Sequence, residues 1–180
     1  MGDQKFLIAA FYKFTKVSLL FELQTEFYKF LENLNIKGTV LLAEEGINGT
    51  VSGSSKSIDK FKNFLFEKDL LSESDFKVSS ADFMPFPRLK VKLKKEIVTI
   101  GNCEINPGKK VGEYVDPLDW NQLITDEDVL VLDTRNTYEV SIGSFEGAIQ
   151  PETTNFREFP EWVETEGSKL PKDKKIAMFC

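Results

Sequence analysis

The pattern of apolar residues changes once along this 180-residue chain, and the change limits the folds open to it. Up to about residue 100, short apolar stretches alternate with stretches of helical spacing, in the order strand, helix, strand, strand, helix, strand, with one more strand after them. Beyond residue 110, continuous apolar runs replace this alternation, as in parallel strands that are covered on both faces. We therefore predict two domains that contain different kinds of sheet.

The first domain is predicted to span residues 1–101 and to be an α+β domain of the ferredoxin-like type. Its order of elements is the split βαβ arrangement, in which two helices cover one face of an antiparallel sheet. Ser18 is the expected N-cap of the first helix. A turn at Glu44, Glu45 and Gly46 is expected to join the second and third strands. The expected strands are residues 6–14, 38–43, 47–52, 76–80 and 89–100, and the expected helices are residues 19–34 and 55–66.

A linker and a second domain are predicted to follow. Residues 102–110 contain Pro107 and Gly108 and show no periodicity, which is typical of a linker. Residues 111–180 have the pattern of the first part of an α/β domain. Its expected strands are residues 129–132, 147–149 and 176–179, and its expected helices lie near Trp120, near Tyr138 and at residues 159–163.

The end of the sequence also carries information. The chain stops at Cys180, directly after an apolar run that has the character of a buried strand. Chain termini usually lie at exposed, weakly packed positions, and a sheet that ends here would be unfinished. We therefore expect this sequence to be the front part of a longer protein.

The chain contains no histidine and only two cysteines, Cys103 and Cys180. A catalytic relay that needs histidine, a cysteine–histidine pair and any zinc site with a histidine ligand are therefore excluded within these residues. Two cysteines are also too few for a disulfide framework or a four-cysteine site, so we expect no metal and a cytoplasmic location. No apolar run approaches the roughly 20 residues of a membrane span, and the N-terminus, acidic at Asp3, lacks the pattern of a signal peptide.

Both buried strands of the second domain are followed by residues that can carry chemistry. Asp133 and Arg135 come after the first of these strands, and Cys180 comes after the second. Ligands of open α/β sheets bind outside the carboxyl ends of the strands, where backbone N–H groups can stabilise a cysteine thiolate, so these two strand ends together are a candidate shared site. Two structural alternatives stay open. In the first alternative, Cys180 is only a buried strand cysteine without a chemical role. In the second, Asp133 has a structural role and either caps the helix near Tyr138 or pairs with Arg135.

The chain carries 23 Lys and Arg against 29 Asp and Glu, and its net charge of −6 argues against diffuse binding of nucleic acid. Cations nevertheless alternate with apolar residues along the last strand of the first domain, which predicts a basic stripe on one face. This stripe is a candidate contact for an RNA backbone. A solvated outer face, or an edge strand protected by lysines, is the alternative. The stripe consists of Arg88, Lys90, Lys92 and Lys94, and Arg157 is a further candidate that either contacts phosphate or pairs with Glu158 or Glu161.

Several motifs together resemble a known family. The segment VLVLDTRNTYEVSIGSFEGAI resembles the first half of a rhodanese domain, and KKIAMFC resembles the strand that delivers the rhodanese cysteine. One departure is Ser144, which stands where rhodaneses usually have histidine. The family with both domains is the rhodanese-containing tRNA uridine hydroxylases, and the chain is similar to it from about Phe6 to Cys180. The motifs that carry this resemblance are LLAEEGINGTVSG, RLKVKLKKEIV, VGEYVDPLDWNQLI and NFRE.

The resemblance implies an oxidoreductase that hydroxylates the wobble uridine of tRNA to 5-hydroxyuridine, with molecular oxygen as co-substrate. It implies an incomplete α/β rhodanese-like second domain, in which Cys180 is the catalytic cysteine and Asp133 and Arg135 support the site. A cysteine-rich C-terminal extension is implied to follow, so this chain alone is expected to be inactive. No other cofactor is identified, tRNA is the expected partner, no membrane is involved, and the oligomeric state stays open.

Two other functions are compatible with the sequence. A sulfurtransferase would carry a persulfide on Cys180, which is what the rhodanese resemblance alone implies. A non-catalytic module would bind RNA or a protein through the ferredoxin-like domain and would not depend on Cys180. For the hydroxylase, we hypothesise that a thiolate or persulfide attacks carbon 6 of the uridine and opens carbon 5 to oxidation.

Overall fold

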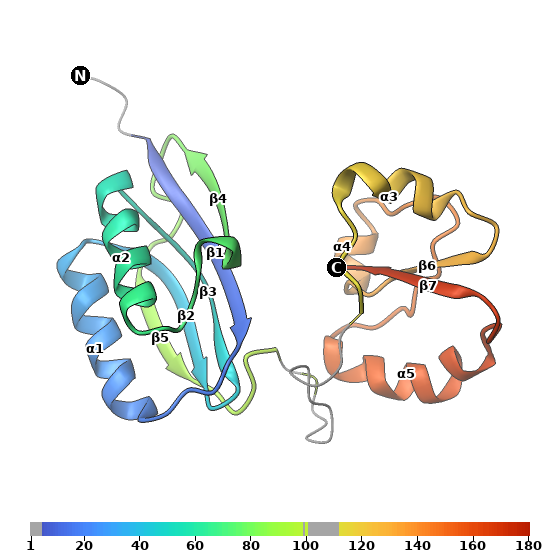
Figure 1. Ribbon diagram of the computed structural model, residues 1–180, viewed down its shortest axis with the longest axis horizontal. Coiled ribbons are helices and arrows are strands. Elements are labelled where there is room, and N and C mark those ends of the chain that lie inside the picture. The colour runs from blue at the N-terminus through green and yellow to red at the C-terminus, as the bar shows by residue number, and fades with distance from the viewer. Residues whose placement is uncertain (1–4, 99, 101–111) are drawn as a thin grey trace. The chain divides into compact units, whose positions relative to one another are not determined.

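The structure of the protein is a computed structural model that describes residues 5–98, 100 and 112–180 (Figure 1). The chain divides into two compact units, Met1–Val98 and Thr99–Cys180. Cys103 and the predicted linker at residues 102–110 lie outside the described residues. Within the described parts, no helix is long and apolar enough to cross a membrane.

The first unit is a five-stranded sheet with two helices on one of its faces (Figure 1). The strands lie in the order β4-β1-β3-β2-β5, and neighbours are antiparallel except for β2 and β5, which are parallel. This confirms the predicted ferredoxin-like α+β domain, although the additional strand makes its sheet mixed rather than wholly antiparallel. The elements are β1 (Phe6–Phe14), α1 (Leu20–Asn33), β2 (Lys37–Ala43), β3 (Gly46–Gly53), α2 (Ser55–Glu67), the 3-10 turn η1 (Glu73–Asp75), β4 (Phe76–Ala81) and β5 (Leu89–Leu93).

Side chains alternate along a strand, so each strand of this sheet presents one set of residues to the helices and another set to the opposite face. Phe11, Val40 and Val51 belong to the buried set and form one core with Phe27 and Phe61 of the helices. The ring of Phe61 meets the rings of Phe11 and Phe27 edge to face, at centroid distances of 5.6 Å and 6.1 Å. Both helices therefore cover the same face of the sheet.

The hairpin between β2 and β3 contains the turn that the sequence predicts. Glu44 and Glu45 alone separate the two strands, and Gly46 begins β3. A Cβ atom at Gly46 would lie 2.2 Å from the carbonyl oxygen of Lys13 and 2.9 Å from Cδ1 of Ile97. Because the first of these atoms belongs to the backbone of the paired strand, only glycine fits there.

Two predicted boundaries in this unit are wrong. The N-cap of α1 is Leu19 rather than Ser18, because the chain enters the helix through a left-handed residue, with φ of 53° at Leu19. Strand β5 ends at Leu93 rather than at residue 100. It ends early because Ile97 turns back onto the hairpin, where its backbone N–H donates to the Glu45 carboxylate at 2.7 Å and its side chain is buried.

The second unit is built around two parallel strands, β6 and β7. Asp116 caps helix α3 by accepting the backbone N–H of Leu118, with Pro117 at the first helical position. The predicted helices near Trp120 and Tyr138 and at residues 159–163 are present. The elements are α3 (Pro117–Ile124), β6 (Val129–Asp133), α4 (Thr137–Val140), α5 (Phe159–Thr165), β7 (Lys175–Phe179) and the 3-10 turns η2 (Phe156–Glu158) and η3 (Gly167–Lys169).

The two strands of this unit differ in burial within these 180 residues. Strand β6 is covered on both faces over most of its length, whereas Ile176 and Met178 of β7 are 48% and 56% exposed. The predicted strand at residues 147–149 is reduced to a single parallel bridge between Leu132 and Ile149.

The packing of the first unit gives a test of its core. Replacing Phe61 with Ala removes a fully buried ring, so we expect the free energy of unfolding of this unit to fall by about 3–5 kcal/mol. Replacing Phe83, which is 72% exposed, with Ala is the matched control and should change it by less than about 0.5 kcal/mol. Native-state hydrogen exchange of the β1 amides measures both changes. Equal losses in the two variants would contradict this assignment of the core.

Candidate functional site

The carboxyl ends of β6 and β7 lie side by side and bring the predicted site residues together. Asp133 is in register with Phe179, the residue before Cys180. Thr134 links the ends of the two strands, because its backbone N–H and its hydroxyl both donate to the Phe179 carbonyl, at 3.0 Å and 2.9 Å. Cys180 is the last residue of the sequence and follows β7 directly. A pocket of about 410 Å³ opens here and is lined by Arg135, Gly143, Ser144, Phe145, Phe179 and Cys180.

Asp133 lies beneath this pocket and does not line it. Its side chain is fully buried and accepts hydrogen bonds from Nε and Nη2 of Arg135, at 3.0 Å and 2.8 Å. It also accepts the backbone N–H of Arg135 at 3.1 Å and the hydroxyl of Ser144 at 2.6 Å. Asp133 does not cap α4, because Asn136 and Glu139 form the capping box of that helix. Of the two structural roles that the sequence left open for Asp133, the structure shows the pairing with Arg135.

The ion pair sets the charge of both partners. Hydrogen bonds from the Arg135 guanidinium hold the pKa of the Asp133 carboxyl below its ordinary value; burial opposes this effect and the bond from Ser144 adds to it. The same contact with Asp133 raises the pKa of the Arg135 guanidinium. The site therefore presents a permanent cation beside Cys180 and keeps its one buried carboxylate ionised.

Arg135 is held in a single orientation. Its Nη2 also donates to the carbonyl of Gly143 at 2.7 Å, and its guanidinium lies over the ring of Phe179 at 5.3 Å. Nη1 has no hydrogen-bond partner among the described residues, and the side chain is 22% exposed. The geometry leaves Nη1 as a donor for an anion or a carbonyl oxygen in the pocket.

The rings of Trp120, Phe145 and Phe179 form an aromatic wall of the pocket, and the sequence did not predict the part that Phe145 and Trp120 play in it. The Phe145 ring meets Phe179 edge to face at 4.9 Å, and Trp120 packs against both rings, at 5.6 Å and 6.0 Å. Phe145 lies in an irregular loop, where no periodicity marks it as a lining residue. Ser144 was noted only as a departure from the rhodanese pattern, whereas its hydroxyl binds Asp133.

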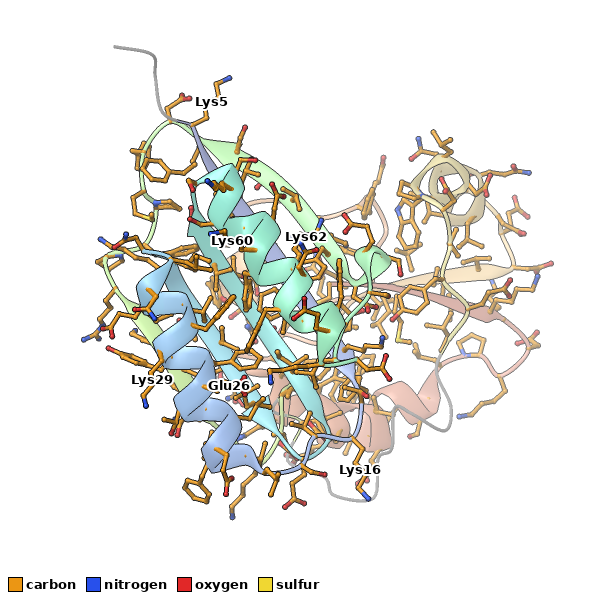
Figure 2. The ribbon with its side chains drawn as sticks, turned by 60° about the vertical axis from the view of Figure 1, so that its left-hand side comes forward. Lys5, Lys16, Glu26, Lys29, Lys60 and Lys62 are labelled. Carbon is orange, nitrogen blue, oxygen red and sulfur yellow. The ribbon has the colours of Figure 1, made fainter. Side chains whose placement is uncertain are left out.

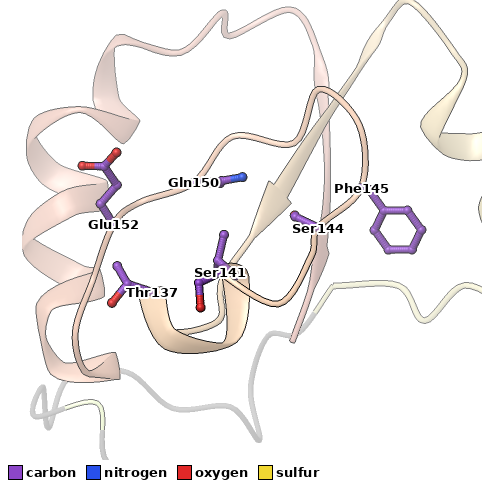
Figure 3. A pocket seen from close by; sticks show the side chains of 7 residues that line it. Thr137, Ser141, Ser144, Phe145, Gln150 and Glu152 are labelled. Carbon is purple, nitrogen blue, oxygen red and sulfur yellow. The ribbon is translucent and has the colours of Figure 1, made fainter.

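A second pocket of about 580 Å³ adjoins the first and shares Ser144 and Phe145 with it (Figure 3). Figure 3 shows that its polar side chains come from helix α4 and from the loop that follows it. Hydroxyl, carboxamide and carboxylate groups line this pocket, so it can bind a polar ligand through hydrogen bonds. The remaining lining residues are Thr137, Val140, Ser141, Gln150 and Glu152.

The basic stripe has the alternation that the sequence predicts. Leu89, Val91 and Leu93 pack on the core beneath the helices. Lys90 and Lys92 therefore lie on the opposite face, where Lys90 is partly buried and Lys92 is exposed. Arg88 and Lys94 flank the strand and are also exposed, and none of the four forms an ion pair with another described residue. Because β5 is an edge strand, protection of that edge stays an alternative.

Arg157 lies in η2 and is exposed. It does not line the pocket beside Cys180, and it forms no ion pair with Glu158 or Glu161. The Glu158 carboxylate is instead bound by Thr154 and Asn155, and hydrogen bonds from Thr154 lower its pKa. Among the residues described, no cluster of three metal-ligating side chains occurs.

The buried ion pair predicts how acid acts on the second unit. The lowered pKa of Asp133 means that its contribution to stability is complete above the unfolded-state pKa of about 3.9 and is lost as the pH falls through the folded-state pKa. At pH 7, we expect Asp133→Asn to lower the free energy of unfolding by about 2–4 kcal/mol. The deficit relative to wild type should shrink below about pH 4, where wild type loses the same contribution.

Urea unfolding followed by tryptophan fluorescence measures this effect, because both tryptophans, Trp120 and Trp162, belong to the second unit. Asp128→Asn is the matched control, since its carboxylate is exposed and little change is expected. A deficit of Asp133→Asn that stays constant down to pH 3 would contradict the assignment to the ionised carboxylate.

Comparison with known proteins places this chain in a family. A family model described as the UPF0176 acylphosphatase like domain matches residues 6–97. A protein named tRNA uridine(34) hydroxylase from Bartonella quintana is 51% identical over 178 residues, which cover 99% of this chain and 59% of that relative. A protein of the same name from a Picosynechococcus species is 48% identical over 175 residues, which cover 97% of this chain and 58% of the relative. This chain thus spans less than two thirds of the length of these relatives.

Among solved structures, an acylphosphatase from Coxiella burnetii is 18% identical, with a TM-score of 0.37, and covers 49% of this chain and 94% of its own. The family predicted from the sequence motifs is confirmed by the curated relatives, which carry its name and are 48–51% identical to this chain over the aligned residues. Because the family model matches more than half of the residues, the chain belongs to the UPF0176 family through its N-terminal acylphosphatase-like domain.

Proposed function

We propose that the whole protein hydroxylates the wobble uridine of tRNA at carbon 5, and that Cys180 is the catalytic residue of this reaction. The observation that carries the proposal is the position of Cys180 in one pocket with the fixed guanidinium of Arg135. The relatives named tRNA uridine(34) hydroxylase support it, since their similarity extends over 97–99% of this chain. As tRNA is a cytoplasmic substrate, the cytoplasm is the proposed location.

The second unit is proposed to be the first part of a rhodanese-like domain. Parallel strands support this, because they present Asp133, Arg135 and Cys180 at their common carboxyl edge. The order of the motifs along the chain supports it as well. The remainder of the domain would lie in the part of the relatives that this chain does not span, so residues 1–180 alone are proposed to be inactive.

The chemistry proposed for Cys180 begins with a bond between Sγ and carbon 6 of the uracil ring. The electron pair of the carbon 5–carbon 6 double bond then moves to carbon 5 and to the O4 carbonyl. Carbon 5 takes one oxygen atom from molecular oxygen, and the second oxygen leaves as water after uptake of two protons and two electrons from a reductant. Loss of the carbon 5 proton and of the Sγ thiolate restores the double bond and gives 5-hydroxyuridine.

Arg135 supplies what this chemistry needs from the protein. Negative charge develops on a carbonyl oxygen of the base when Sγ adds, and a fixed cation with an unused N–H stabilises such charge. Nη1 of Arg135 is that donor, and Asp133 keeps the guanidinium in place. Asp133 is thus a positioning residue. The edge of the Phe145 ring, which is 39% exposed, offers a surface against which the base can pack.

Contacts to the RNA backbone are proposed for the basic stripe of the first unit and for Arg157. Lys92, Lys94, Arg88 and Arg157 are exposed and have no ion pair within the described residues. Such cations can exchange counterions for phosphates when RNA binds. They would supply affinity, whereas the pocket beside Cys180 would select the base.

The catalytic role of Cys180 is tested by nucleoside mass spectrometry of tRNA from cells that lack the gene and any parallel route to 5-hydroxyuridine. Complementation with the full-length wild type should restore the nucleoside, and Cys180→Ala should leave it at least 100-fold lower, because Cys180 supplies the only thiol among the described residues that line the pocket. Cys103→Ala is the matched control and should restore it fully. Normal 5-hydroxyuridine with Cys180→Ala would refute the proposal.

Sulfur transfer is the second candidate, because a persulfide on Cys180 would also be an anion beside Arg135. In that case the purified full-length protein would transfer sulfur from thiosulfate to cyanide and release sulfite and thiocyanate. Thiocyanate formation that depends on Cys180, together with an unchanged level of 5-hydroxyuridine in the deletion strain, would favour the sulfurtransferase.

A further inference from the structure

The face of the first sheet that the helices leave uncovered has an unusual charge pattern for an acidic protein. By strand alternation, this helix-free face consists of every second residue of β1 to β5, beginning with Phe6 on β1. It carries four lysines and no aspartate or glutamate from any strand. The lysines are Lys37 on β2, Lys77 on β4, and Lys90 and Lys92 on β5.

The register shows how these charges are arranged. One row crosses all five strands, from Lys77 through Ala10, Thr50 and Thr39 to Lys90, each residue paired with the next. Strands are spaced by about 4.8 Å, so the two lysines at its ends start about 19 Å apart. The three residues between them have short side chains. The row therefore places a lysine on each edge strand with three partly exposed residues between them, whereas Ser52 in the next row of the same face is fully buried.

The helical side of the same unit differs. Its lysines alternate with carboxylates, and several of them are paired: Lys68 binds Glu26 at 2.7 Å, and Lys62 binds Glu73. Figure 2 shows this side, with Lys60 and Lys62 on α2 and Glu26 and Lys29 on α1. Among the described strand residues, the helix-free face thus differs from the helical side by carrying lysines with no carboxylate between them.

We infer that the helix-free face, from Lys77 on β4 to Lys90 and Lys92 on β5, is a docking surface for the backbone of an RNA strand. The choice of RNA as the occupant rests on the proposed function. The location of the proposed surface is inferred from the sheet, because lysines on both of its edge strands form no ion pair with another described residue and can bind a chain of phosphates. Lys77 thereby becomes an RNA contact on the edge strand farthest from the basic stripe.

The dimensions of this face and the types of side chain on it are compatible with binding of a nucleic acid. A four-stranded sheet of the same split βαβ kind holds roughly two or three bases in RNA-recognition motifs. The threonine hydroxyls of the row can bond to ribose 2′-hydroxyl groups, which suits RNA rather than DNA. The 47% exposed ring of Tyr12 lies on the same face, one row away.

Charge reversal at the far edge tests this inference. In the full-length protein, we expect Lys77→Glu to weaken tRNA binding roughly five- to tenfold, as Lys90→Glu does, and to lower the slope of log K against log salt by about 1. Lys77→Gln should give a smaller loss in the same direction. Lys60→Glu is the matched control, since Lys60 is an exposed lysine on the helical side and should change affinity less than twofold. Binding is followed by fluorescence anisotropy of labelled tRNA across a salt series.

Three results would overturn the inference. Lys77→Glu could bind like wild type while Lys90→Glu is weakened, in which case only the β5 edge contacts RNA. All three reversals could weaken binding equally, which would be an effect of net charge. The wild type could fail to bind tRNA or could bind it more weakly than anionic vesicles of phosphatidylserine; tighter binding to vesicles would assign the face to a membrane. Circular dichroism spectra that match wild type exclude misfolding of the variants.

The proposed function is tested by a separate measurement, the amount of 5-hydroxyuridine in cellular tRNA. If wild type binds tRNA through Lys77 but makes no 5-hydroxyuridine, the docking surface stands and the hydroxylase proposal fails. If Cys180→Ala abolishes the nucleoside while Lys77→Glu leaves tRNA affinity unchanged, the hydroxylase proposal stands and the docking surface fails.

Discussion

Helices α1 and α2 pack on one face of the first sheet, and the two-residue period of the strands then assigns every strand side chain to the core or to the opposite face. Phe11 and Val91 enter the core, and the residues next to them, Lys90 and Lys92, are directed to the other face. The packing of both helices on one face of the sheet thus produces the hydrophobic core on that face and a cationic surface on the other. In a chain with a net charge of −6, this is how a local excess of positive charge arises.

The second unit depends in the same way on one ion pair. Asp133 is buried at the end of β6, and a carboxylate in that position needs the hydrogen bonds that Arg135 and Ser144 donate. Satisfying this carboxylate fixes the guanidinium, and the fixed guanidinium faces the pocket that holds Cys180. Asp133 therefore both satisfies the buried end of β6 and orients the guanidinium of the pocket, although Asp133 itself does not line the pocket.

Much of the fold could be predicted because apolar spacing is a local property. The helices with residues 19–34 and 55–66, and the strands that follow them, came from spacing alone, and the order of elements identified the domain type. Boundaries set by distant contacts could not be predicted. Strand β5 stops at Leu93 because Ile97 binds back to Glu45, which is 52 residues away. The pocket wall is a similar case, because Phe145 meets Trp120 and Phe179 only after folding.

The sequence by itself determined the two kinds of sheet, the absence of histidine chemistry, the alternation along the basic strand and the two strand ends that carry Asp133, Arg135 and Cys180. These follow from residue identity and spacing, which folding does not change. Only the tertiary structure decided that Asp133 holds Arg135 instead of capping a helix, that Arg135 and Cys180 line one pocket, and that Lys77 shares a face with Lys90. Those facts depend on strand order and register, which bring together residues far apart in the chain.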